Sequence, residues 1–515
     1  MPRLIDYTSY ADAHRHYSAA ALWDLFDGDR QRLNIAHECV DRWAAATPDR
    51  TAVRLAYADG TNAEITFREL SVWSSRFAHW LRAKGVGKGE RVAIMLEPSP
   101  PFYAALFGAM KAGAVAVPLF TLFGPDGVRL RVDDCTPSLL LTTPEKAADL
   151  PGVIVTVADA GFMLALEAFP DTFEPATSAD DMAMFQYTSG TTRDLPEAIR
   201  HTHRAIAVVA NAALYGTGVR PGDRFFCPSS PAWGHGLWHG TLAPLGLGVE
   251  TGTYSGRFDA ERLLAALSAF RITNLSAAAT HYRMMKNSGA ADKYRYVLEK
   301  MSFTGEPIDS ETLAFAEATF RTRMCSMYGT TEVGVILADY PGASDFQGKP
   351  GSLGKPVPGV KVAVIGPDGA PAHAGEIKVW RRDGWFATKD RGRVDEDGYF
   401  WHGGRADDVI ISAGWTIGAT EVEDAILTHP AVSEAAVIGV PDELRGQVVK
   451  AFIVARQPGD PALATAIQDH VRARLSHHEY PRQIAFVAEL PKTPAGKVNR
   501  KVLRDRDEQQ RKQTA

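Results

Sequence analysis

Cysteine is scarce in this sequence, and the four cysteines lie far apart. They stand at positions 39, 135, 227 and 325 of a chain of 515 residues. A zinc site or a dithiol redox centre is marked by cysteines in close pairs, and no such pair occurs here. The sequence therefore predicts reduced cysteines and a cytoplasmic protein.

The sequence also lacks an excess of basic charge and any long apolar run. Its 56 Lys and Arg residues against 61 Asp and Glu residues give a formal net charge of −5, which offers no basic field to nucleic acid or to an anionic membrane. The most apolar stretch, residues 103–120, is interrupted by Lys111 and Pro118, whereas a membrane span needs roughly 20 unbroken apolar residues. The N-terminus has early charges and no apolar stretch, unlike a secretory signal. We expect neither nucleic acid nor a membrane as the main partner.

What is present is typical of a multidomain α/β enzyme. The chain is 45% hydrophobic and 23% charged, as in ordinary globular proteins, and its length suggests two to four domains. Residues 89–120 combine an apolar run, a helix-like segment and a second apolar run, which predicts a strand–helix–strand unit. Similar runs at 138–141 and 153–157 favour mostly parallel sheets covered by helices.

The pattern changes towards the C-terminus. From about residue 351, short strands and glycine turns predict a small β subdomain. After residues 403–405, a helix with apolar positions 422, 425 and 426 and strands at 435–440 and 450–454 predict a separate small α/β domain. We expect the charged residues from about 505 onward to fray.

Three short stretches carry residue types suited to phosphate groups and nucleotides. Residues 188–192, Thr-Ser-Gly-Thr-Thr, follow a strand-like run and offer hydroxyls and backbone N–H groups to phosphate oxygens; a Ser/Thr-rich turn is the alternative. Residues 328–332, Tyr-Gly-Thr-Thr-Glu, offer an aromatic plane, a glycine for close approach and a carboxylate for Mg²⁺. The basic stretch 491–501 is broken by prolines and a glycine, which by itself is typical of a solvated loop.

Taken in this order, the three stretches resemble motifs of the adenylate-forming superfamily, which includes acyl-CoA synthetases, luciferases and peptide-synthetase adenylation domains. The resemblance covers roughly residues 40–505. It implies a large N-terminal domain, 1–406, which binds ATP and the acid, and a small mobile domain, 407–515, which carries the catalytic lysine. The implied reaction activates a carboxylic acid with ATP and then transfers the acyl group to CoA. Further matching stretches are 304–307, 375–376, 389–392, 404–410 and 412–415.

The resemblance implies roles for single residues in the first half-reaction. Lys497 would be the catalytic residue that bridges the substrate carboxylate and the α-phosphate, with Thr331 at the α-phosphate and Glu332 on Mg²⁺. Tyr328 would stack on adenine, with a place in the core as its alternative. Asp390 would accept hydrogen bonds from the ribose hydroxyls, an ordinary turn carboxylate being its alternative. The implied nucleotide-binding residues are Thr188, Ser189, Gly190, Thr191, Thr192, Gly305, Glu306, Pro307, Tyr328, Gly329, Thr330, Asp390 and Arg405.

Other residues match positions that serve the acid and CoA. Asp407 matches the hinge between the two domains. Gly414 and Trp415 fall where the pantetheine chain of CoA would approach, with a surface turn as the alternative. Trp233 and His235 fall in the segment that builds the wall of the acyl pocket, and His235 is alternatively a core histidine with satisfied hydrogen bonds.

The phosphate loop departs from the family pattern. After Thr192 the family usually continues with Gly and then Pro-Lys-Gly, whereas residues 193–198 here are Arg-Asp-Leu-Pro-Glu-Ala. A carboxylate near the triphosphate would be repelled by on the order of 1 kcal/mol or more. We therefore predict that Glu197 points away and that Arg193 or Arg200 supplies the compensating charge. The alternative is a catalytically silent nucleotide-binding homologue.

Three further sequence features bear on which carboxylic acid is activated and which molecule accepts the acyl group. The Tyr328 stretch lacks the paired tryptophans typical of acetyl-CoA synthetases, so we expect an acid larger than acetate. Residues 411–423 resemble medium-chain and acetyl-type acyl-CoA synthetases. The chain stops about 18 residues after Lys497, without a carrier domain, which favours a free-standing CoA ligase; a carrier-loading enzyme and a luciferase-like oxygenase are the alternatives. The surroundings of Lys497 also resemble the lysine whose acetylation controls some bacterial acyl-CoA synthetases.

Overall fold

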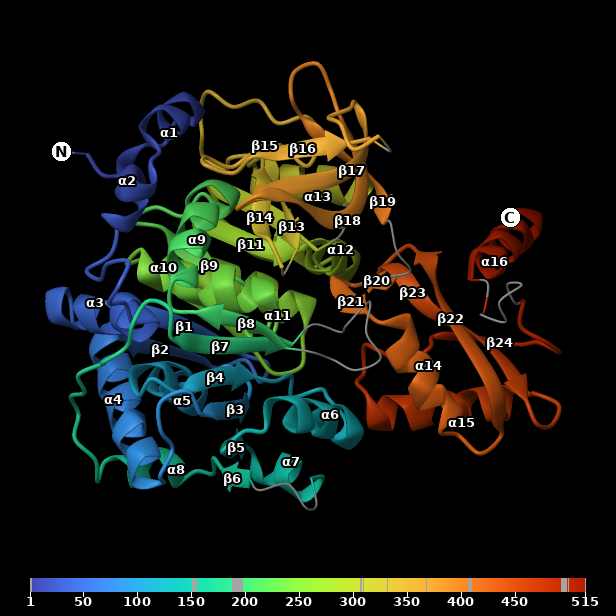
Figure 1. The fold of residues 1–515 in the computed structure, drawn as a ribbon, viewed down its shortest axis with the longest axis horizontal. Coiled ribbons are helices and arrows are strands. Elements are labelled where there is room, and N and C mark those ends of the chain that lie inside the picture. The colour runs from blue at the N-terminus through green and yellow to red at the C-terminus, as the bar shows by residue number, and fades with distance from the viewer. Residues whose placement is uncertain are drawn as a thin grey trace. The chain divides into compact units, whose positions relative to one another are not determined.

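The computed structural model describes residues 2–150, 155–187, 198–305, 308, 310–330, 332–366, 368–405, 410–491, 498 and 500–514. They form two compact units (Figure 1). The large unit comprises Met1–Thr121, Cys135–Gln186 and Ile199–Ala406. The small unit comprises Leu122–Asp134, Tyr187–Ala198 and Asp407–Ala515.

A six-stranded sheet forms around the strand–helix–strand unit that the sequence predicts. Its strand order is β6-β5-β3-β4-β7-β8, and the pairs β3–β4, β3–β5, β5–β6 and β4–β7 are parallel. Its strands are β3 (Arg91–Met95), β4 (Val115–Pro118), β5 (Leu139–Thr142), β6 (Val155–Val157), β7 (Met182–Tyr187) and β8 (Ala198–Thr202). The helices of the large unit in this part of the chain are α4 (Phe67–Ala83), α5 (Pro100–Lys111), α7 (Pro144–Ala148) and α8 (Phe162–Leu166). Helix α6 (Pro125–Cys135) belongs to the small unit up to Asp134.

A nine-stranded sheet has the order β15-β14-β13-β12-β11-β9-β10-β1-β2. The six strands from β13 to β1 are parallel, and antiparallel strands flank them at both edges. The strands are β1 (Thr51–Tyr57), β2 (Asn62–Thr66), β9 (Arg224–Phe226), β10 (Glu250–Ser255), β11 (Asn274–Ala278), β12 (Lys300–Thr304), β13 (Met324–Thr330), β14 (Gly334–Ala338) and β15 (Lys355–Pro356). The helices that follow these strands include α11 (Ala260–Ala269), α12 (Ala279–Ser288) and α13 (Ser310–Phe320).

Apolar side chains cover both faces of this sheet. On one face, Leu263 of α11, Tyr282 of α12 and Phe320 of α13 pack in one cluster with strands β11 and β12. On the other face, a larger cluster joins the sheet to the six-stranded sheet and includes α5, α9 (Ala205–Ala212) and α10 (Ala243–Gly246). A parallel sheet buried on both faces is the α/β arrangement, so the predicted fold class is confirmed. The remaining helices of the large unit are η1 (Leu4–Asp6), α1 (Tyr10–His16), α2 (Ala19–Trp23), η2 (His37–Asp41), α3 (Arg42–Ala46), η3 (Ala213–Thr217), η4 (His235–Leu242) and η5 (Ala291–Lys293).

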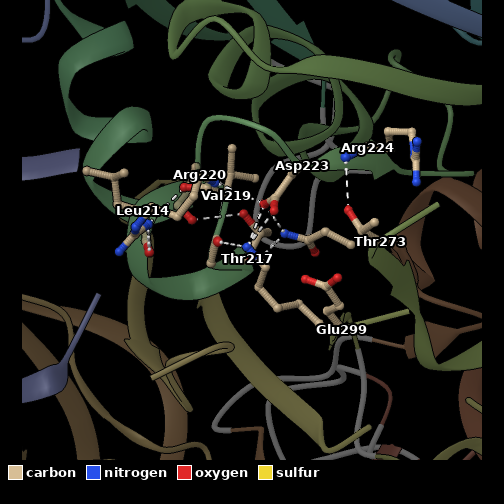
Figure 2. A network of polar contacts seen from close by, with 12 residues as sticks. Leu214, Thr217, Val219, Arg220, Asp223, Arg224, Thr273 and Glu299 are labelled. Carbon is tan, nitrogen blue, oxygen red and sulfur yellow. Dashed lines mark hydrogen bonds and ion pairs between the residues drawn. The ribbon is translucent and has the colours of Figure 1, made fainter. Parts of the chain in front are cut away.

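The amino ends of β9, β11 and β12 are joined by a network of polar contacts (Figure 2). Lys300 Nζ lies 2.6 Å from Asp223 Oδ2 and donates to the carbonyl of Gly218 at 2.8 Å. Asn274 Nδ2 donates to Asp223 Oδ2 at 3.1 Å and to the carbonyl of Thr217 at 2.9 Å. The Asp223 carboxylate therefore has its charge paired and its oxygens hydrogen-bonded inside the protein.

The predicted β subdomain is an antiparallel four-stranded sheet. Its order is β16-β17-β18-β19, with its own small apolar cluster that includes Val364, Ile377 and Phe400. The strands are β16 (Val362–Ile365), β17 (Ala374–Arg381), β18 (Gly384–Val394) and β19 (Phe400–Arg405).

The small unit is built on the long antiparallel pair β22–β23. Helices α14 and α15 pack on one face in a cluster that includes Val422, Ile426 and Ile467, and Leu503 of α16 packs with a different cluster that includes Ile438 and Phe452. The elements are β20 (Ile410–Ser412), β21 (Trp415–Ile417), α14 (Ala419–Leu427), β22 (Val432–Asp442), β23 (Gly446–Ala455), α15 (Pro461–Arg474), β24 (Gln483–Phe486) and α16 (Arg500–Thr514).

The prediction that the chain frays from about residue 505 is wrong. Residues 500–514 form α16, and Leu503 is only 2% exposed. Asp507 is buried as well, 2.5 Å from Lys450 Nζ on β23 and 2.8 Å from Arg511 Nε. The strong overall polarity of the tail hides one buried stripe, because a helix needs only every third or fourth residue to face the protein.

No helix in the described part of the chain is both long and apolar enough to cross a lipid bilayer. The apolar stretch around residues 103–120 instead holds α5, β4 and the residues beside them. α5 is buried almost throughout, and Lys111 at its end pairs with Asp41 at 2.6 Å.

Candidate active site

The predicted nucleotide residues of the large unit lie at the carboxyl ends of parallel strands. Gly305 follows β12 directly, and Tyr328, Gly329 and Thr330 end β13. Because β12 and β13 are parallel neighbours, these ends meet at the same edge of the sheet, which is where open α/β sheets bind ligands.

Tyr328 and Asp390 meet, although 62 residues separate them in the sequence. The Tyr328 hydroxyl donates to Asp390 Oδ2 at 2.7 Å. The Asp390 carboxylate is 4% exposed, and His402 Nε2 lies 3.7 Å from its Oδ1. In the ladder between β18 and β19, Asp390 stands opposite Arg405. The structure thus brings three predicted nucleotide residues to one place.

The turn after Tyr328 is shaped by a glycine. A Cβ atom on Gly329 would lie 1.9 Å from the carbonyl oxygen of Gly334, so only glycine fits where β14 folds back on β13. Thr330 Oγ1 then donates to Glu332 Oε2 at 2.6 Å, and Glu332 is exposed. A carboxylate and a hydroxyl supply the oxygen ligands that Mg²⁺ prefers, so this pair fits the predicted metal role.

His235, predicted to line the acyl pocket, is held by hydrogen bonds on both sides of its ring. It is 5% exposed; its Nδ1 lies 3.0 Å from Ser229 Oγ and its Nε2 lies 2.8 Å from Ser276 Oγ. Ser302 Oγ donates to Ser276 Oγ at 2.8 Å, which extends the chain across β11 and β12. A neutral imidazole has one donor and one acceptor nitrogen. In His235 both nitrogens therefore already have hydrogen-bond partners. Trp233 is half-buried and packs edge-on against His235, with ring centroids 5.4 Å apart.

Two further histidines accompany His235 and were not predicted. His239 follows one turn later in η4, with ring centroids 6.3 Å from those of His235. His281 lies in the first turn of α12, after β11, and its Nδ1 accepts the Ala278 N–H at 3.2 Å. The spacing of four residues from His235 could have pointed to His239, whereas no local signal marks His281.

Burial keeps these imidazoles uncharged. It lowers the pKa of His239 and of His281 to about 4, and it lowers the pKa of His235 well below its ordinary value. The charges that the other two rings would carry lower the pKa of His235 further. At neutral pH the three side chains therefore offer hydrogen bonds but no positive charge.

The residues predicted to meet CoA lie in a tight hairpin of the small unit. Ser412 pairs with Trp415, and the two residues between them, Ala413 and Gly414, have φ of 55° and 77°, as a type I′ turn requires. The Trp415 ring stacks on His478 with centroids 4.3 Å apart. Burial and the charges of Arg445 and Arg482 lower the pKa of His478 to about 3, so the stack is uncharged at neutral pH.

Several predicted residues lie outside the described residues. For Arg405 only the backbone position in β19 is described. Arg200, one of the two cations expected to compensate for Glu197, lies on β8 with its guanidinium 5.1 Å from the centre of the Phe185 ring. The predicted residues outside the described part are Thr188, Ser189, Gly190, Thr191, Thr192, Arg193, Glu197, Glu306, Pro307, Thr331, Asp407 and Lys497.

A cavity of about 540 Å³ in the large unit is separate from these groups. Its described lining includes Glu317 of α13, Arg323, Asp339 and Lys349, and it includes none of the predicted site residues. The candidate active site therefore lies at the carboxyl ends of the parallel strands, and this cavity is not part of it.

Two family models match the chain. The model for AMP-binding enzymes matches residues 40–382, and the model for the C-terminal domain of AMP-binding enzymes matches residues 421–497. The first range contains the predicted residues from Thr188 to Glu332, and the second range ends at Lys497.

Similar proteins extend along nearly the whole chain. Acetyl-coenzyme A synthetase of Bacillus subtilis (strain 168) is 31% identical, over 96% of this chain and 94% of that protein. The 4-hydroxybutyrate–CoA ligase 1 of Metallosphaera sedula is 31% identical, over 88% of this chain and 86% of that protein. The crystal structure of Brucella canis acyl-CoA synthetase, 31% identical, covers 98% of this chain and 100% of its own, with a TM-score of 0.71. The chain therefore belongs to the family of AMP-binding enzymes, in its acyl-CoA synthetase branch.

Proposed function

We propose that this chain activates a carboxylic acid larger than acetate with ATP and transfers the acyl group to CoA. The observation that carries the proposal is the hydrogen bond from Tyr328 to the buried Asp390 carboxylate at the carboxyl end of β13, with the backbone of Arg405 opposite Asp390 in the ladder. An aromatic ring beside a buried carboxylate suits a nucleoside, since the ring can stack on adenine and the carboxylate can accept from both ribose hydroxyls.

In the first half-reaction, an oxygen of the acid's carboxylate forms a bond to the α-phosphorus of ATP, and the bond to pyrophosphate breaks. We propose that the Lys497 ammonium holds the carboxylate and the α-phosphate together, and that Thr331 donates to the α-phosphate. Such a transfer depends mainly on position and on neutralising charge. A Mg²⁺ ion held by Glu332 would supply part of that neutralisation when bound. Arg193 or Arg200 would offset the charge of Glu197.

In the second half-reaction, the sulfur of CoA forms a bond to the acyl carbon and AMP leaves with the electron pair of the broken C–O bond. We propose that the pantetheine chain passes Gly414 and the Trp415 ring, whose stack on His478 holds it in place. We also propose domain boundaries at 1–406 and 407–515, with Asp407 as the hinge that lets one site serve both half-reactions.

Two further proposals concern the setting of the enzyme. Acetylation of Lys497 would remove the charge that the first half-reaction uses, so we propose it as a means of control. A cytoplasmic location is supported by the four cysteines, all of which are buried free thiols.

The test is pyrophosphate release from ATP and Mg²⁺ with straight-chain, branched and aromatic acids, with and without CoA, and with Lys497→Ala as the control. We expect release with a subset of acids, loss of release in the variant, and a thioester by mass spectrometry only when CoA is present. Release without a thioester would instead indicate a carrier protein as acceptor. Binding of ATP in titration calorimetry without release from any acid would indicate a catalytically silent homologue.

A further inference from the structure

Three uncharged imidazoles, those of His235, His239 and His281, lie in a region where a site for a hydrocarbon chain would have apolar side chains. His235, in the segment predicted to form the wall of the acyl pocket, packs on the half-buried Trp233, and the ring of His239 lies 6.3 Å from that of His235 along η4. His281, in the first turn of α12, is close enough to His235 to lower its pKa. His235 and His239 are 5% and 8% exposed. Polar side chains this deeply buried normally have hydrogen-bond partners. A buried nitrogen without a partner in the protein therefore indicates a position where a ligand could form the hydrogen bond.

His235 has a complete set of partners, and His239 does not. Both nitrogens of His235 are bonded to serine hydroxyls. His239 Nδ1 is enclosed and has no hydrogen-bond partner among the described residues. Leaving a buried acceptor or donor unpaired costs free energy that a hydrocarbon chain cannot recover. The structure thus leaves one enclosed hydrogen-bonding position at the predicted acyl wall.

His281 adds a second polar position of defined chemistry. Its Nδ1 accepts the Ala278 N–H, so the single proton of the neutral ring is on Nε2, which is a donor. His201 Nε2 is likewise buried without a partner among the described residues, where its ring meets Trp238 at 4.7 Å between centroids. These rings carry no charge at neutral pH, because burial lowers the pKa of each to about 4. A second carboxylate on the acid would therefore find no positive charge on these imidazoles.

We propose that the acid activated by this chain carries an uncharged hydroxyl away from its carboxylate, and that His239 binds that hydroxyl, with His281 Nε2 as a second donor of the same histidine group. A hydroxyl both donates and accepts, so it can satisfy the unpaired nitrogen of His239. The inference rests on the proposed function, since it names the acid of the same site. The similarity to 4-hydroxybutyrate–CoA ligase 1 over 88% of this chain supports it.

The test compares acids that differ only by the hydroxyl. Pyrophosphate release is measured for butyrate against 4-hydroxybutyrate and for benzoate against 3-hydroxybenzoate, as kcat/KM for each acid. We expect the hydroxy acid of at least one pair to be preferred by about tenfold or more, because a site with buried polar groups rejects the analogue that leaves them unpaired. A ratio near one, or a preference for the parent acid in both pairs, would overturn the inference while leaving the proposed function intact. No release with any of the four acids, or with those of the wider panel, would refute both.

Variants of His239 separate recognition from stability. In His239→Leu the preference should fall to near one, mainly through KM for the hydroxy acid, and in His239→Gln, which keeps a donor and an acceptor, part of it should return. His203→Leu is the matched control: His203 is a buried neutral imidazole whose Nδ1 accepts the Ile35 N–H at 3.0 Å. This control should destabilise the fold without changing the preference. Equal changes of preference in His239→Leu and His203→Leu would count against recognition by His239.

Discussion

The two ends of the nine-stranded sheet hold polar residues of different kinds. At the amino ends, Asp223 and Lys300 form an ion pair in which each side chain is about one-tenth exposed (9% and 10%). At the carboxyl ends, the described buried polar groups include uncharged imidazoles, hydroxyls and the Asp390 carboxylate, which accepts from Tyr328, and the Glu332 carboxylate after the Tyr328 turn is exposed. At the amino ends the polar groups are therefore paired with one another inside the protein. At the carboxyl ends some polar groups have hydrogen-bonding capacity left for a bound molecule. Substitutions at the amino ends should mainly change the free energy of unfolding. Substitutions at the carboxyl ends should mainly change the kinetic constants.

The largest effect on stability is expected from Lys300→Met. It leaves the buried Asp223 carboxylate without its cation, and breaking a buried pair in this way costs about 3–5 kcal/mol of unfolding free energy. Urea unfolding followed by tryptophan fluorescence measures the loss, and KM for ATP should not change. The double variant Asp223→Asn with Lys300→Met removes the unpaired charge as well and should recover part of the loss. An unchanged urea midpoint in the single variant would show that the pair is dispensable.

At the other end, Asp390→Ala should lower kcat/KM for ATP by on the order of 100- to 10,000-fold. A carboxylate that accepts from two hydroxyls contributes about 1.5–3 kcal/mol through each bond. Its effect on the urea midpoint should be smaller than that of Lys300→Met. Asp397→Ala is the control, because this carboxylate is 70% exposed and pairs only with Lys349 among the described residues. Similar kinetic losses in both variants would contradict the ribose role of Asp390.

The pH dependence of unfolding should follow the buried histidines. Burial lowers their pKa to about 4, from 6.5 in the unfolded chain, so the unfolded state binds more protons between these values. Their contribution to stability is complete above pH 6.5 and falls as the pH drops towards 4, by at most about 1.4 kcal/mol per pH unit for each histidine. Burial raises the pKa of Asp339 to about 6, which opposes part of this slope. The histidines are His201, His203, His239 and His281.

Urea midpoints measured from pH 7 to pH 4.5 test this expectation and separate the two ends of the sheet. His281→Gln should reduce the slope, since one titrating group is lost. The double variant Asp223→Asn with Lys300→Met should lower the whole curve. A slope that His281→Gln does not alter would mean that this imidazole titrates normally.

The smallest effect is expected from Tyr328→Phe. The change keeps the aromatic plane and removes only the hydroxyl that donates to Asp390. A single hydrogen bond contributes about 1 kcal/mol, so KM for ATP should rise roughly fivefold. A loss as large as that of Asp390→Ala would show that the hydroxyl, and not the carboxylate alone, meets the nucleotide.

Local patterns in the sequence were sufficient for the fold class and for the order of the elements. The apolar runs at 91–96 and 115–117 appear as β3 and β4, and the segment between them contains α5. Of the predicted strand 153–157, the part that the structure describes is β6. The family of AMP-binding enzymes could also be predicted from the sequence, because its motifs are short, occur in a fixed order and have specific chemistry. The assigned roles of single residues remain predictions.

Contacts between distant residues could not be predicted from such patterns. The polar tail forms a helix because Leu503 packs with Ile438 and Phe452 and Asp507 pairs with Lys450. These partners on β22 and β23 are distant in the sequence. His281 escaped notice for the same reason, since its importance comes from its position near His235 and not from its sequence neighbours.

The sequence by itself determined which residue types are available and in what order: apolar runs with the periods of strands and helices, and motifs with the hydroxyls, glycines and charges of nucleotide chemistry. Only the tertiary structure decided which of them meet. The parallel pairing of β9, β11, β12 and β13 gathers their carboxyl ends at one edge, and the return of β18 brings Asp390 to Tyr328. Burial then decided the charge of the histidines, because the pKa of an imidazole depends on the water it has lost and not on its neighbours in the sequence.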